Sequence, residues 1–62
     1  MNYYEILQVS SAASHEMIQM AYQTLQNQYH IESLQGDKKY AELKMQQLDE
    51  AYRVLSSPIL RQ

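Results

Sequence analysis

The fold of this chain is decided by residues 14–32, SHEMIQMAYQTLQNQYHIE. The apolar residues of this stretch lie along one side of an α-helix, at Ile18, Ala21, Tyr22, Leu25 and Tyr29. That spacing fits no β-strand, in which apolar and polar residues alternate. Ser14 is a good N-cap, and His30 suits the negative C-terminal end of a helix. The pattern therefore predicts a helix over residues 14–30.

A second apolar stripe with helical spacing follows in the C-terminal half, at Ala41, Met45, Leu48, Ala51, Tyr52 and Leu55. It predicts a helix over residues 38–55, with Asp37 as its N-cap. Residues 31–37 are mostly polar and contain the only glycine, Gly36, so we expect a loop of about seven residues there. Two long amphipathic helices joined in this way pack antiparallel and face to face.

Two short helices are predicted at the ends of the chain, over residues 3–7 and 58–62. The first depends on packing for its stability, and Pro58 opens the second with Ser57 as its cap. The predicted fold class is therefore all-α, an antiparallel helical hairpin with short N-terminal and C-terminal helices. Its core is expected to contain Ile18, Ala21, Leu25, Tyr29, Met45, Leu48, Ala51 and Leu55. At the tip of the hairpin we expect Leu34 to fold back and Ile31 to be exposed.

Length and composition narrow the functional classes. Sixty-two residues allow one small domain, and the absence of cysteine leaves helix packing as the source of its stability. No apolar run approaches the roughly 20 residues of a membrane span, and no signal-peptide pattern is visible. We therefore expect a cytoplasmic domain with no direct membrane contact.

The charges are unevenly distributed along the chain. The formal net charge is −2. Residues 1–37 contain four acidic residues and no lysine or arginine, whereas residues 38–62 contain five basic and three acidic residues. A protein that binds nucleic acid carries a clustered basic face. We therefore expect no nucleic-acid partner.

No catalytic or metal-binding arrangement is evident in the sequence. His15 and His30 lie fifteen residues apart on one predicted helix, which separates them by about 22 Å, too far to share a metal ion. Gly36 stands alone, so there is no glycine-rich phosphate loop. We expect that the chain is not an enzyme and needs no metal, cofactor or small-molecule substrate. Its partner is expected to be a protein.

Four segments resemble the J-domain of DnaJ-type co-chaperones: NYYEILQV at 2–9, ASxExIxxAY at 13–22, LxxxYH at 25–30 and LxEAYxVLSxP at 48–58. The resemblance covers nearly the whole chain in the same order and spacing. It implies a J-domain-like fold and a protein partner, a heat-shock chaperone that hydrolyses ATP. The J-domain pattern continues beyond residue 62, so we expect residues 1–62 to be one J-like domain of a longer protein.

The sequence departs from the J-domain pattern at the residues that carry its activity. Working J-domains have a His-Pro-Asp tripeptide where this chain has His30, Ile31 and Glu32. Their second helix presents a basic face to the chaperone, whereas the matching positions here are neutral. The resemblance implies that the partner-binding residues are the tripeptide at 30–32 with Gln19, Tyr22, Gln23 and Gln26, and we expect Thr24 and Gln28 to lie on the same face.

Two interpretations remain open from the sequence. In the first, the chain is a degenerate J-like interaction module that no longer stimulates a heat-shock chaperone ATPase. In the second, it is a functional DnaJ-type co-chaperone with an unusual tripeptide, which assists protein folding. A neutral face slows association with a charged partner, and a displaced carboxylate weakens a pair built for another geometry. Both departures favour the first interpretation.

Overall fold

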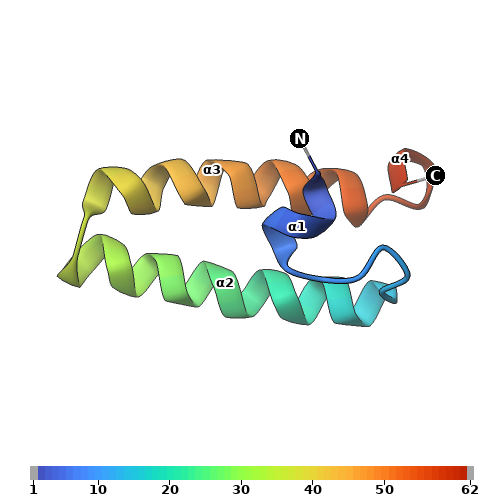
Figure 1. Cartoon of the computed structure of the whole chain (residues 1–62), viewed down its shortest axis with the longest axis horizontal. Coiled ribbons are helices and arrows are strands. Elements are labelled where there is room, and N and C mark those ends of the chain that lie inside the picture. Colours follow the sequence, from blue (N-terminus) through green and yellow to red (C-terminus); the bar gives the residue numbers. More distant parts are fainter. Residues whose placement is uncertain (1, 62) are drawn as a thin grey trace.

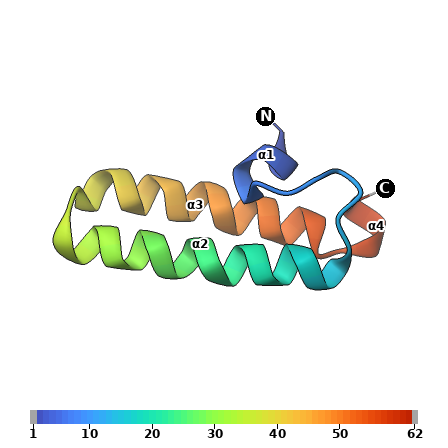
Figure 2. The same cartoon turned by 60° about the horizontal axis from the view of Figure 1, so that its bottom comes forward.

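The computed structural model describes residues 2–61 and contains four helices: α1 (Tyr3–Leu7), α2 (His15–Gln35), α3 (Lys38–Leu55) and α4 (Pro58–Arg61). The long helices α2 and α3 lie side by side and antiparallel, joined by a tight turn at one end (Figure 1). Helix α1 lies across one side of this hairpin, and α4 lies at its open end (Figure 2). No strand occurs within residues 2–61, so the predicted all-α hairpin is confirmed.

Side-chain caps fix where the helices begin. The hydroxyl of Ser14 accepts a hydrogen bond from the Met17 amide at 3.2 Å, and the Asp37 carboxylate accepts one from the Tyr40 amide at 3.0 Å. The Ser57 hydroxyl caps α4 in the same way. Each cap satisfies a backbone N–H that has no partner inside its helix. The helix starts predicted from these capping residues are confirmed.

The core lies where α1 crosses the α2–α3 hairpin. Its three largest fully buried side chains come from different helices, Leu7 from α1, Ile18 from α2 and Leu48 from α3. The remaining buried residues are small or lie along the hairpin seam: Ala13, Leu25, Ala41, Ala51 and Leu55. Apolar area removed from water in this way is the main source of stability for a small helical domain.

Three predicted core residues are only half-buried, namely Ala21, Tyr29 and Met45. They lie at the margins of the α2–α3 interface, which a short third helix covers only in part. Ala13 is buried although it precedes α2, because the connector from α1 runs over the open end of the hairpin (Figure 2). The spacing of apolar residues along one helix cannot predict the burial of a residue that lies in a connecting segment.

The predicted end of the second helix is wrong. Helix α2 continues past residue 30 to Gln35, and the connection to α3 consists of Gly36 and Asp37 alone. Leu34 does not fold back but is 72% exposed, whereas Ile31 is exposed as expected. The reason is local, because residues 31–35 contain no proline or glycine that would end a helix.

Gln8 ends α1 in an unfavourable backbone conformation. Its φ is 58° and its ψ is 42°, which is the left-handed region, and it is the only non-glycine residue with positive φ among residues 2–61. Such a conformation costs an L-residue about 1–2 kcal/mol relative to the right-handed one. Glycine has no Cβ and adopts it freely.

We expect Gln8→Gly to raise the free energy of unfolding by about 1 kcal/mol, measured by urea denaturation. The matched control is Gln8→Ala, which removes the side chain beyond Cβ but keeps the steric conflict. It should leave stability unchanged or slightly lower. Equal stabilisation by both variants would show that the side chain of Gln8, and not its backbone conformation, is unfavourable.

Candidate partner-binding surface

Residues 30–32 lie inside α2, within its last two turns, and not in a loop. Successive residues of an α-helix point about 100° apart around its axis. The three side chains of the tripeptide therefore cannot project together toward one partner. This geometry follows from Ile31, which supplies the backbone N–H and the free φ that a proline at that position would remove.

His30 lies on the same side of α2 as three of the predicted glutamines, Gln19, Gln23 and Gln26, and all four are exposed. An open depression of about 330 Å³ between α2 and α3 is lined by Gln23, Gln26, Asn27, His30 and Met45. The structure therefore brings His30 together with the glutamine face. Its lining contains amides, one imidazole and one thioether, but no lysine, arginine or carboxylate.

Tyr22, also predicted as a site residue, is half-buried at the edge of this face. Its ring stacks on that of Tyr52 with centroids 4.1 Å apart, and its hydroxyl donates a 2.8 Å hydrogen bond to Asp49 Oδ1. This hydrogen bond, together with burial and the negative charge of Asp49, raises the pKa of Tyr22. The bond persists at neutral pH and is lost only as pH rises through that raised pKa. Tyr22 therefore fixes α2 to α3 rather than offering a free hydroxyl.

Ile31 and Glu32 face a different part of the surface from His30. They line a second depression, of about 310 Å³, at the tip of the hairpin with Gln28, Tyr29, Gln35 and Tyr40. The Glu32 side chain folds over Gly36, where a Cβ atom would lie 2.6 Å from Glu32 Cδ. The side chain of Glu32, a half-buried residue, thus lies against the turn and away from the glutamine face.

Thr24 and Gln28 do not belong to the glutamine face, which corrects the expectation from the sequence. Both line a third depression, of about 250 Å³, between α2 and α1. Conversely, Asn27 and Met45 line the depression beside His30 and were not predicted. Asn27 lies one helical turn before His30 and so could have been found from the sequence, whereas Met45 comes from α3 and required the packing of the hairpin.

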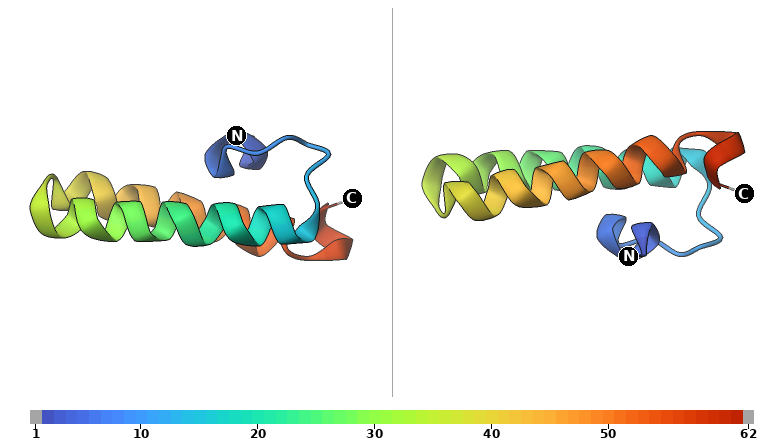
Figure 3. Two further views of the ribbon diagram at one scale, coloured as in Figure 1. Left: turned by 90° about the horizontal axis from the view of Figure 1, so that it is seen from below. Right: turned by 90° about the horizontal axis from the view of Figure 1, so that it is seen from above.

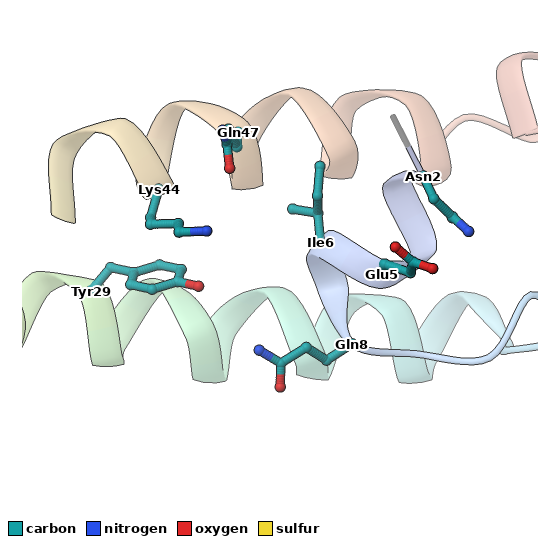
Figure 4. A pocket seen from close by; sticks show the side chains of 7 residues that line it. All are labelled: Asn2, Glu5, Ile6, Gln8, Tyr29, Lys44 and Gln47. Atoms are coloured by element: carbon teal, nitrogen blue, oxygen red, sulfur yellow. The ribbon is translucent and has the colours of Figure 1, made fainter. Parts of the chain in front are cut away.

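A further depression, of about 340 Å³, lies between α1 and the hairpin (Figure 4). Its polar lining includes Glu5, Gln8, Tyr29, Lys44 and Gln47. Lys44 lies over the ring of Tyr40, with its Nζ 5.6 Å from the ring centroid. No nucleophile is paired with a base among these residues. Within residues 2–61, no group of three His, Cys, Asp or Glu side chains could hold a metal ion.

Comparison with known proteins supports the resemblance noted in the sequence. The DnaJ domain model matches residues 2–62. Chaperone protein DnaJ of Deinococcus proteolyticus is 48% identical over 61 residues, which cover 98% of this chain and 19% of that protein. Chaperone protein DnaJ of Anaplasma marginale (strain Florida) is 49% identical over 57 residues, covering 92% of this chain and 15% of that protein. No solved structure matches the chain.

The chain thus spans less than a fifth of the length of these relatives. None of the helices within residues 2–61 is both long and apolar enough to cross a membrane. The match extends over all four helices, from α1 to α4. The chain belongs to the DnaJ domain family.

Proposed function

We propose that this chain is a J-like protein-interaction module that does not stimulate the ATPase of a heat-shock chaperone. The observation that carries the proposal is the unbroken helix through residues 30–32. A tripeptide in a loop can direct its side chains to one partner surface. In α2, by contrast, His30 lines one depression while Ile31 and Glu32 line another.

The charge of the surface supports the same proposal. The exposed residues around His30 on α2 are Gln19, Gln23, Gln26 and Asn27, all neutral. J-domains that stimulate a chaperone are expected to use basic residues on this helix against an acidic partner. Complementary charge raises association rates by 10-fold to about 1,000-fold, and a neutral face loses that increase. The proposed module therefore binds such a chaperone slowly and weakly.

A second function is favoured by a different observation. His30 keeps its place in the J-domain pattern and is exposed beside Gln23 and Gln26. A chaperone that needs only this imidazole and hydrogen-bonding amides would still be activated. On that observation the alternative is a functional co-chaperone, which binds a heat-shock chaperone ATPase and assists protein folding.

The test is single-turnover ATP hydrolysis by a bacterial heat-shock chaperone of the 70-kDa class, with the chain added in excess. We expect no measurable acceleration, whereas the corresponding domain of the Deinococcus relative serves as the positive control. Robust stimulation by the unmodified chain would overturn the proposal and establish the co-chaperone function.

A repair series separates the two defects. Ile31→Pro with Glu32→Asp restores only the tripeptide and is expected to recover little activity, because the helix face stays neutral. Adding Gln19→Lys, Gln23→Arg and Gln26→Lys should raise the association rate about tenfold or more, and the gain should shrink with salt because charges are screened over about 10 Å at 0.1 M. The matched control places the same three charges away from both depressions, at the exposed positions Ser11, Leu43 and Gln46, and should give no comparable gain.

A further inference from the structure

Six exposed residues on the outer side of α2 follow the alternating three- and four-residue spacing of a coiled-coil seam. We call them the outer seam: Met17, Met20, Thr24, Asn27, Ile31 and Leu34. This spacing keeps side chains on one line along a helix that meets another helix. The outer seam is separate from the stripe of Ile18, Tyr22 and Leu25, which packs on the rest of the domain.

Four of the six residues of the outer seam are apolar and exposed. Met17, Met20, Ile31 and Leu34 are 56%, 67%, 46% and 72% exposed. The left view of Figure 3 shows α2 in front, with α3 behind it and no other element across its outer side. These residues form two exposed apolar pairs, Met17 with Met20 and Ile31 with Leu34, and the polar Thr24 and Asn27 lie between them. Exposed apolar groups gathered on one side of a small domain are candidates for an interaction surface. Half of this apolar content lies beyond residue 30, on the part of α2 that exists because no proline interrupts it.

We infer that the outer seam is a self-association surface, on which α2 of a second copy of this chain packs antiparallel. The inference does not depend on the proposed function, because it is tested by a different measurement. The outer seam shares Asn27 and Ile31 with the depressions that contain the tripeptide, but its six residues run along another side of α2. It also differs from the glutamine face, of which only Gln23 and His30 border the seam.

Antiparallel pairing makes the outer seam self-complementary. Residues whose numbers add to 51 face one another, so Met17 meets Leu34 of the second copy and Met20 meets its Ile31. At the centre, Thr24 meets Asn27 of the second copy, and the hydroxyl and the amide can hydrogen-bond. A polar pair at one seam position fixes the register of helices at some cost in stability. Apolar pairs thus lie at both ends of the interface. The Thr24–Asn27 pair occurs twice at its centre, once on each side of the twofold axis.

The borders of the outer seam favour a second copy over a charged partner. They are Glu16, Gln23 and His30 on one edge and Ala21, Gln28 and Gln35 on the other. Only Glu16 is charged when histidine is neutral, so two copies do not repel along the seam. In the antiparallel pair the two Glu16 residues lie at opposite ends of the interface, and the helix dipoles oppose each other. A parallel pair would place both Glu16 residues and both positive helix ends together.

The contact between two outer seams is small. The seam spans 17 residue steps, about 26 Å, and a helix with its side chains is about 10–12 Å wide. The contact therefore covers on the order of 300 Å² of each copy, well below the about 800 Å² per partner of stable complexes. Because α2 is already folded, association does not require the helix to be ordered first. A weak, concentration-dependent dimer follows.

Sedimentation equilibrium of the whole chain from about 10 μM to about 1 mM tests the inference, since this range brackets a weak dissociation constant. We expect the apparent mass to rise toward that of a dimer. Leu34→Glu should weaken association at least about tenfold, because it buries a charge at both ends of the pair. Leu43→Glu is the matched control on α3, where Leu43 is 55% exposed and off the seam, and it should leave association unchanged.

Cross-linking tests the antiparallel arrangement without relying on that variant. The chain has no cysteine, so single cysteines are unique. A mixture of Met17→Cys and Leu34→Cys chains should form mixed disulfides in preference to either self-disulfide. Preferential self-disulfides would establish a parallel pair and overturn the arrangement. A chain that stays monomeric across the whole concentration range would overturn self-association, whether or not it binds lipid vesicles or another helix. Equal weakening of association by Leu34→Glu and Leu43→Glu would overturn it as well.

Discussion

Replacing Leu48 by alanine is expected to lower the free energy of unfolding by about 2–5 kcal/mol, as other large-to-small core substitutions do. Leu48 is fully buried in the middle of α3 and belongs to the cluster that joins α1, α2 and α3. Alanine would remove apolar area from that cluster and leave a cavity. A domain of this size has about 3–9 kcal/mol of stability in total. The variant should therefore lose a large part of its free energy of unfolding at room temperature. Urea or thermal unfolding followed by far-UV circular dichroism measures this loss.

Leu43→Ala is the matched control for this measurement. It makes the same chemical change on the same helix, but Leu43 is 55% exposed. Surface substitutions of this kind alter stability by about 0.5 kcal/mol or less. If the two variants melted together, the buried face of α3 would have been assigned to the wrong side of the helix.

The helix starts and the core stripes could be predicted from the sequence because each depends on local chemistry. Ser14, Asp37 and Ser57 cap their helices through backbone amides three residues away, so the signal lies within a few residues. The spacing that places Ile18 and Leu25 on one side of α2 is equally local. Ala13 could not be predicted in this way, because its burial depends on where the connector crosses the hairpin.

The end of α2 was mispredicted for a physical reason that bears on function. The sequence predicts a loop over residues 31–37 because they are mostly polar and include the only glycine, Gly36. Nothing before Gly36 breaks a helix, and Ile31 can donate its backbone N–H within the helix, which a proline cannot. The glutamine face was predicted in part. Gln19, Gln23 and Gln26 share a side of α2 with His30, whereas Ile31 and Glu32 turn away because the helix continues.

Ile31→Pro alone is expected to end α2 at or before His30. The substitution removes the backbone N–H of residue 31, its ring conflicts with the carbonyl four residues earlier, and it disfavours helical geometry at His30. A proline inside a helix costs about 3 kcal/mol, and this is an upper limit here because residues 31–35 can unwind instead. Far-UV circular dichroism should show the loss of about one turn of helix, and amide hydrogen exchange should become fast over residues 32–35.

Ile31→Ala is the matched control, since it shortens the same exposed side chain but keeps the backbone N–H. It should retain the full length of α2 and change stability by about 0.5 kcal/mol or less. If Ile31→Pro and Ile31→Ala had the same helix content and the same melting temperature, residues 30–35 would not be helical in solution. The helix would then no longer hold the side chains of residues 30–32 in different directions, and this reason for a lack of chaperone stimulation would be removed.

The same pair of variants connects the two surfaces of α2. Unwinding residues 31–35 removes Ile31 and Leu34 from the outer seam, so Ile31→Pro should abolish self-association, whereas Ile31→Ala should only weaken it. Unwinding also releases the three side chains of the tripeptide from their fixed positions around the helix. A single proline is therefore expected to exchange a surface suited to a second copy of this chain for a loop of the kind that J-domains present to a chaperone. Measuring apparent mass and amide hydrogen exchange on the same two variants tests that exchange directly, whereas ATPase stimulation is expected to stay low in both because the helix face remains neutral.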